Sequence, residues 1–303
     1  MLTAKALTEL VAQAKPDRAA YCGVSDHMPH VQQISYKRQT FVLGTFNVLN
    51  PAFMYYQNGV PPPGESLPKQ FRLEDQRGLE HLPSSQPERQ TEREAIILNA
   101  ILDFMKKTER TVLCLQECWS GLTNGLLLQK ESIGFEVIVG CPIYEKSYNV
   151  TLVSKQLEYT VVNSMKKSIT IELGSMAISN VHLEFSSIAT LALLKKLLQE
   201  PAGAEHHWVV GDFNVQTQPL SPALIYEQVN TATLCDVAQN IMYETKREPW
   251  FAVHPRRWTN WNNRANCSRH EQNAEHFDNL MLVSSEPAAF VLQYVDWMVE
   301  MKK

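Results

Sequence analysis

The chain has 303 residues, of which 44% are hydrophobic and 20% are charged, and its formal net charge is −4. These values are typical of a soluble globular protein with a large core, and the length suits one large α/β domain or two small ones. The weak negative charge argues against a protein that coats nucleic acid through a broad basic surface. It leaves room for an enzyme with a local basic groove.

The sequence shows neither a membrane span nor a secretion signal. No apolar run approaches the length of a transmembrane helix, and residues 1–15 lack the continuous apolar core of a signal peptide. The six cysteines are scattered, several of them in apolar runs such as Leu113-Cys114-Leu115, which favours reduced structural thiols. We therefore expect a cytoplasmic protein, although a protein secreted without such a signal would have the same features.

Apolar spacing predicts the elements of the first half of the chain. In order, we expect a helix at 3–14, strands at 31–36 and 40–46, a helix at 91–107, a strand at 111–115 and a helix at about 121–129. Thr91 and Glu94 have the spacing of a capping box at the start of the second helix. Residues 58–90, rich in Pro, Gly, Ser and charge, indicate a long loop or lid.

The second half of the chain reads mainly as strands. We expect strands at 135–139, 149–154, 159–162, 168–173 and 176–183, a helix at 188–199, a strand at 207–210, helical turns at 222–228 and 234–241, and strands at 280–283 and 290–294. No repeat is evident. The pattern predicts one domain over residues 1–303, in which two packed sheets have helices outside them.

The most informative segment is Gly211-Asp212-Phe213-Asn214, which follows a short buried strand. Residues two apart on a strand point to the same face, so Asp212 and Asn214 can aim at one small polar object. Oxygen donors of this kind suit Mg²⁺. The segment therefore points to a phosphate held by a metal ion.

Other polar residues also stand where apolar strands begin or end, namely Asn47, Glu117, Asn180, His182 and Asp278. Each of them has an ordinary reading when taken alone. Asn47 suits a turn, Glu117 a solvated surface and His182 a half-buried structural position. Strand ends on one rim of a layered domain can converge on a pocket, and only this joint pattern favours a functional site.

The joint pattern resembles the endonuclease/exonuclease/phosphatase superfamily, which includes deoxyribonuclease I-like enzymes, deadenylases, neutral sphingomyelinases and inositol-polyphosphate 5-phosphatases. Five segments match its motifs in order: Thr45-Phe46-Asn47-Val48-Leu49, Leu115-Gln116-Glu117, Asn180-Val181-His182-Leu183, Gly211-Asp212-Phe213-Asn214, and Phe277-Asp278-Asn279-Leu280, where Asn279 replaces the usual aromatic residue or His. The resemblance implies an α/β (α+β) four-layer sandwich of mostly antiparallel sheets. It also implies phosphoester hydrolysis that depends on Mg²⁺, with Mn²⁺ as the alternative ion.

One motif is out of place. The superfamily closes with Ser-Asp-His-x-Pro after its last matched strand, but here Ser25-Asp26-His27-Met28-Pro29 precedes Asn47. We interpret this order as a circular permutation, in which the closing motif and its strand have moved to the front. Domains whose ends lie close together tolerate such rewiring. The alternative is an inactive relative that has lost its last motif.

The resemblance implies three sets of site residues. They are the metal ligands Asn47, Glu117 and, through water, Asp26; the catalytic residues His27, His182, Asp212, Asn214 and Asp278; and the substrate-binding residues Asn180, Tyr148 and Asn149. In these roles Asp212 orients and deprotonates the attacking water. Asp278 pairs with His27, which contacts the phosphate, and His182 is a second donor to the transition state.

The catalytic residues are shared across the superfamily, so the substrate must be inferred from the residues around them. The wording around Asn47 and Glu117 is most similar to the deadenylase-like branch, which implies a nuclease acting on single-stranded RNA. The alternatives are a phosphoinositide phosphatase or sphingomyelinase-like phosphodiesterase, and a catalytically silent binding protein of the same fold. Action at a membrane would favour a basic or apolar amphipathic patch, which the sequence does not show convincingly.

Overall fold

Strands with both faces buried form the centre of the protein, and they build two sheets. The computed structural model describes residues 1–14, 25, 27–51, 90–142, 147–183, 187–199, 204–215, 233–257, 259–262, 273–275 and 278–299. The first sheet has the order β14-β1-β2-β3-β5-β4. Its strands are β1 (His30–Tyr36), β2 (Gln39–Asn47), β3 (Thr111–Cys118), β4 (Phe135–Val139), β5 (Tyr148–Ser154) and β14 (Phe290–Tyr294).

The second sheet also has six strands, in the order β10-β13-β9-β8-β7-β6. They are β6 (Thr160–Met165), β7 (Ser168–Leu173), β8 (Met176–His182), β9 (His206–Asp212), β10 (Pro249–Phe251) and β13 (Asp278–Ser284). A small separate ribbon pairs β11 (Asn260–Asn262) with β12 (Asn273–Glu275). The two large sheets are mixed but mostly antiparallel, as the sequence predicted.

Each sheet contains one parallel pair among the described strands, β2–β3 in the first and β8–β9 in the second. Parallel strands end at the same edge of a sheet. A hydrogen bond from Asn47 in β2 to Asp212 in β9, and the close approach of His182 in β8 to Glu117 in β3 (3.6 Å), show that the two edges meet. We call this edge of the sandwich the carboxyl rim. The antiparallel neighbours β1, β5 and β13 begin at the same rim.

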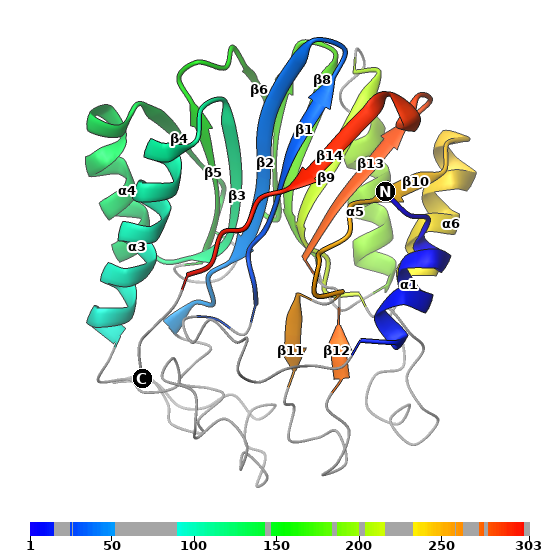
Figure 1. Cartoon of the computed structure of the whole chain (residues 1–303), viewed down its shortest axis with the longest axis horizontal. Helices are drawn as coiled ribbons and strands as arrows, with labels where there is room; N and C mark the ends of the chain where they lie inside the picture. The colour runs from blue at the N-terminus through cyan, green and yellow to red at the C-terminus, as the bar shows by residue number, and fades with distance from the viewer. Residues whose placement is uncertain are drawn as a thin grey trace, which may run out of the picture.

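Helices cover both outer faces of the pair of sheets (Figure 1). Helices α3 (Gln90–Lys107) and α4 (Ser120–Ile133) pack on the first sheet, through side chains such as Ile97, Ile101 and Leu122. Helices α1 (Ala4–Ala12), α5 (Ser187–Gln199) and α6 (Leu234–Thr245) pack on the second. A third cluster, which includes Leu43 and Trp208, fills the space between the sheets. The layers are therefore helix, sheet, sheet and helix.

Most of the predicted elements are confirmed, with shifts of a few residues at their ends. The capping box is wrong, because α3 already contains Gln90 and Thr91, and Glu94 accepts a hydrogen bond from the Trp119 indole instead (2.5 Å). The short strands β10, β11 and β12 were not predicted. The expected loop at 58–90 (all but its last residue) and the turns at 222–228 lie outside the described residues.

The cysteines and the helices agree with two expectations from the sequence, reduced thiols and no membrane-spanning helix among the described residues. The described cysteines, Cys114, Cys118, Cys141 and Cys235, are free thiols. Burial raises the pKa of Cys114 and Cys118 far above the usual range, so both stay protonated at neutral pH. Among the described helices, none is long and apolar enough to cross a membrane.

His207, at the start of β9, makes stability depend on pH. Its ring is buried and its Nε2 lies 2.7 Å from the Ser179 hydroxyl. Burial lowers its pKa from 6.5 to about 4. The folded state therefore binds this proton less readily than the unfolded state, and the stabilisation present above pH 6.5 is lost as the pH falls towards 4.

We predict that lowering the pH from 7 to 5 reduces the free energy of unfolding of the wild type by about 2 kcal/mol more than that of His207→Gln. The reason is that Gln keeps a polar group but does not titrate. Urea unfolding of both proteins at the two pH values measures the difference. Equal losses of stability in the two proteins would contradict the prediction.

Candidate active site

Glu117 reaches the carboxyl rim through an irregularity in β3. The pairing of β3 with β5 shifts register between Leu115 and Cys118, and Glu117 has a φ of 59°. A bulge of this kind re-aims a side chain, and a positive φ at a residue other than Gly is costly. The redirected carboxylate accepts hydrogen bonds from Asn47 Nδ2 and from the backbone N–H of Asn50, both at 3.0 Å.

Asp212 reaches the rim through a second irregular backbone. Gly211 has a φ of 144°, and a Cβ there would lie 1.9 Å from the Val181 carbonyl oxygen. Asp212 follows it, fully buried, and accepts hydrogen bonds from Asn47 Nδ2 and from the backbone N–H of Asn214, both at 2.9 Å. Asn214 has a φ of 47° and donates its side-chain amide to the Leu183 carbonyl oxygen. The sequence Gly-Asp-x-Asn thus fits this turn residue by residue.

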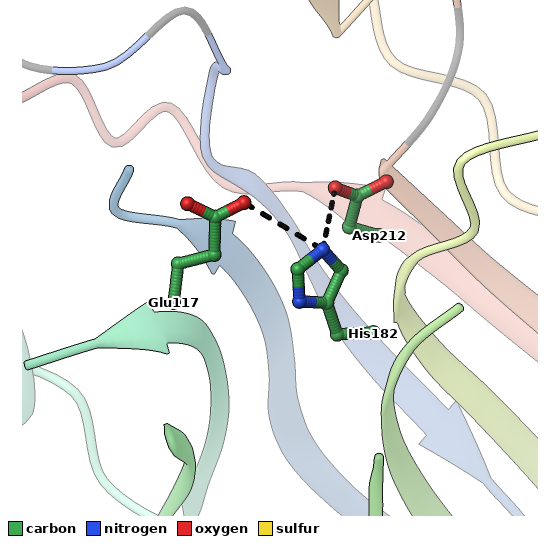
Figure 2. A group of neighbouring side chains, drawn as sticks. All are labelled: Glu117, His182 and Asp212. Atoms are coloured by element: carbon green, nitrogen blue, oxygen red, sulfur yellow. Dashed lines mark ion pairs between the residues drawn. The ribbon is translucent and has the colours of Figure 1, made fainter. Parts of the chain in front are cut away.

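His182 lies between the two carboxylates (Figure 2), with its Nε2 3.6 Å from Glu117 and 3.7 Å from Asp212. Burial and then the charge of Lys167 lower the pKa of His182 to about 3. The imidazole is therefore neutral at pH 7 and has a lone pair to offer. One ligand atom from each of the three residues lies within 4.8 Å of the others, a spacing that can hold a metal ion.

His27 comes from the segment before β1 and meets residues from the far end of the chain. Its Nδ1 lies 2.8 Å from Asp278 Oδ2, and its Nε2 lies 3.8 Å from Asp212 Oδ2. Ser25 fixes this segment, because its hydroxyl donates to the Asn47 carbonyl oxygen and accepts from the His27 N–H. The Asp278 N–H is held by the Thr259 hydroxyl.

Burial raises the pKa of Asp212 to about 7, and Asp278 also raises it, whereas His27, Asn47 and the Asn214 N–H oppose the rise. A buried carboxylate that keeps a proton close to neutral pH lacks enough positive charge around it. The donor set at this point therefore suits an added cation.

A pair of buried amides lies just below these groups and joins the two sheets. Gln116 Nε2 donates to Asn180 Oδ1 at 2.8 Å, and its Oε1 accepts from the Thr45 hydroxyl. The Asn180 amide nitrogen contacts the carbonyl oxygens of Leu115 and Val150. Both amides are fully buried. They fix the separation between the sheet that carries Glu117 and the sheet that carries His182 and Asp212.

The structure thus brings together seven of the residues expected at the site: His27, Asn47, Glu117, His182, Asp212, Asn214 and Asp278. Asn149 lies at the same rim but donates its amide to the Lys167 carbonyl oxygen, and Tyr148 begins β5 there. The side-chain amide of Asn180 is hydrogen-bonded to Gln116 and to the backbone of β3 and β5. Asp26 lies outside the described residues. The ligand role of Asn47 stays a prediction, because its Oδ1 accepts from the Leu49 N–H in this structure.

Sequence reasoning missed Arg93, which supports the site from α3. This guanidinium is almost fully buried and donates to the carbonyl oxygens of Val48 and Leu49, the two residues that follow Asn47. It also lies over the Trp119 ring. An Arg within a helix is usually a surface residue, so the sequence holds no signal that would have singled it out.

No family model and no curated protein matches the chain. Among solved structures, it is similar to an endonuclease/exonuclease/phosphatase from Bacteroides vulgatus, at 14% identity over 65% of this chain and 82% of that chain, with a TM-score of 0.45. An AP endonuclease from Archaeoglobus fulgidus is similar at 16% identity, over 64% of this chain and 84% of that chain, with a TM-score of 0.44. ANGEL2, a 2',3'-cyclic phosphatase, is similar at 11% identity, over 88% of each chain, with a TM-score of 0.47. At these values the likeness concerns the fold alone.

We predict that Gly211→Ala destabilises the protein by at least about 2 kcal/mol, because the added Cβ meets the Val181 carbonyl in a backbone conformation that L residues avoid. Gly134→Ala is the matched control, since Gly134 also has a positive φ but open space around its Cβ. We expect it to cost only about 1 kcal/mol. Urea unfolding compares the two, and an equal or smaller loss for Gly211→Ala would refute the steric argument.

Proposed function

We propose that this protein is a divalent-metal-dependent phosphoesterase that cleaves the phosphodiester bonds of single-stranded RNA. One observation carries the proposal: the buried group of Glu117, His182 and Asp212 lies next to the hydrogen-bonded pair of His27 and Asp278. Phosphoester hydrolysis needs a positioned water, a base and positive charge at the phosphate oxygens. The residues of the carboxyl rim can supply each of these.

The donor set fits a hard or borderline cation. Two buried carboxylates within reach of a neutral imidazole, with the pKa of Asp212 raised by burial, are a costly arrangement that a cation would relieve. Glu117 and His182 would hold Mg²⁺ or Mn²⁺, since carboxylate oxygens suit both ions, and Asp212 would face a water bound to the ion. Such an ion would serve as Lewis acid and template for the phosphate.

Asp212 is the candidate base. Its Oδ1 is bonded to the Asn214 N–H and its Oδ2 to the Asn47 amide, so the carboxylate is held in one orientation. It would orient and deprotonate the attacking water. Asn214 would fix the water or the phosphate from the same turn.

His27 is the candidate contact to the developing phosphate charge. Asp278, 2.8 Å from its Nδ1, fixes the ring orientation and favours the cation. The opposite nitrogen, Nε2, then faces Asp212. A proton on this nitrogen would stabilise a phosphate oxygen in the transition state.

The position of His27 supports the proposed circular permutation. Strand β1, which follows this residue, pairs with β2 through a two-residue turn at Lys37 and Arg38. The opposite edge of β1 pairs with β14, near the other end of the chain. The segments that carry the first and last motifs of the superfamily are therefore neighbours in one sheet (Figure 1). A two-residue turn is enough to connect them in the permuted order.

We predict that the wild type hydrolyses at least one member of a small panel in the presence of Mg²⁺ or Mn²⁺, and that EDTA stops the reaction. The panel holds single-stranded RNA with an oligo(A) tail, single- and double-stranded DNA, a phosphoinositide and sphingomyelin. Asp212→Asn should lower kcat by at least about a hundredfold, because it removes the base and keeps the shape. His27→Ala should lower kcat by a similar factor.

Thermal unfolding controls for the fold of both variants. Turnover of Asp212→Asn within a few-fold of the wild type would rule out the assigned base. Full activity of His27→Ala would exclude the N-terminal segment from the site, and with it the permutation. Absence of turnover across the panel at saturating metal would leave a binding protein of the same fold.

A further inference from the structure

The turn between β6 and β7 brings two lysines to the carboxyl rim. Met165 pairs with Ser168, so Lys166 and Lys167 form a two-residue hairpin turn. Ser168 in turn pairs with Val181, the residue before His182. The register of the second sheet thus places this turn directly beside the end of β8.

The backbone of Lys167 is bonded to two residues of the site. Its carbonyl oxygen accepts a hydrogen bond from the His182 N–H at 3.1 Å and another from Asn149 Nδ2 at 3.0 Å. Lys166 is exposed and Lys167 is half-buried. Because the anchor uses main-chain atoms, a change of either lysine side chain leaves the turn in place.

The turn adds positive charge where the carboxylates have left the rim negative. Glu117 and Asp212 lie 3.6 Å and 3.7 Å from Nε2 of His182. A phosphate that reacts beside His182 would therefore lie close to the turn that carries both lysines.

A strand of nucleic acid carries one negative charge at each phosphate, and lysine side chains bind such charges as point contacts. A small phosphomonoester has no second phosphate to place there. We propose that Lys166 and Lys167 bind the phosphate that flanks the cleaved bond, so that the site takes a single-stranded oligonucleotide rather than an isolated phosphoester. This inference rests on the proposed phosphoesterase function and adds to it the residues that bind the substrate strand beside the cleaved bond.

The test is direct binding of fluorescein-labelled single-stranded oligo(A) RNA, followed by anisotropy in a range of salt concentrations. Asp212→Asn serves as the parent protein, so that the RNA stays intact. In this parent, Lys167→Gln should weaken binding by about five- to tenfold, and the slope of log Kd against log salt should fall by about 0.7, the value for one lost contact to a single strand. Lys167→Gln should weaken the binding of oligo(C) RNA by the same factor, because a phosphate contact does not depend on the base.

Lys37→Gln is the matched control. Lys37 also lies in a two-residue hairpin turn, but between β1 and β2, at the opposite rim. We expect its replacement to change neither the affinity nor the salt slope. Equal binding by the Lys167 and Lys37 variants would overturn the inference, as would a loss of affinity without a change in slope.

Failure of the inference and failure of the proposed function give different results. If the enzyme cleaves RNA but the Lys167 variant binds it with unchanged affinity and salt slope, the phosphoesterase function stands and the lysine subsite is wrong. If the parent protein binds no oligonucleotide while the wild type hydrolyses a phosphoinositide, both the lysine subsite and RNA as the substrate are wrong, and only the phosphoesterase class stands. If the wild type hydrolyses no phosphoester at all, the function itself fails, whatever the lysines bind.

Discussion

Two buried carboxylates from different sheets share one amide. Asn47 donates through the same nitrogen to Glu117 at the end of β3 and to Asp212 at the end of β9. Without these bonds the two acidic groups would face each other at close range in a buried setting, where like charges are costly. The geometry of the rim depends on this bridge, because it sets how far apart the acidic ends of the two sheets lie.

The rest of the fold supports that bridge from several directions. The hydrogen bond between Gln116 and Asn180 joins the two sheets next to the site. Arg93 donates to the backbone carbonyl of Leu49, two residues after Asn47. The residues that bear the chemistry also carry strain, since Glu117 and Asn214 have positive φ angles. Strained residues persist only where their surroundings over-determine them. Here the strain lies at the residues whose side chains must converge.

Much of the site could be predicted from the sequence, because it sits at strand ends that apolar runs make visible. The apolar runs before Asn47, Glu117 and Asp212, and the run after Asp278, predict the strands and place these polar residues at strand ends. The motif order also singled out His27, whose contact with Asp278 joins residues far apart in the chain. Convergence followed from parallel register, which the sequence does not encode locally.

Other features could not be predicted, for physical reasons that differ. A buried Arg93 looks like any helical arginine until its carbonyl partners are known. Strands of three residues, such as β10, are too short for a period of two to show. The left-handed backbone at Glu117 depends on a register shift against β5, which is a tertiary effect. The lysine turn beside His182 became visible only through the pairing of β7 with β8.

The central claim is that the carboxyl ends of the two parallel strand pairs form a divalent-cation centre. Anomalous diffraction from crystals soaked in MnCl₂ tests it most directly, because Mn²⁺ marks its own position. We expect a peak enclosed by Glu117, His182 and Asp212, and the loss of this peak in Glu117→Gln. A map with no peak at this point under saturating Mn²⁺, or with a peak only elsewhere, would contradict it.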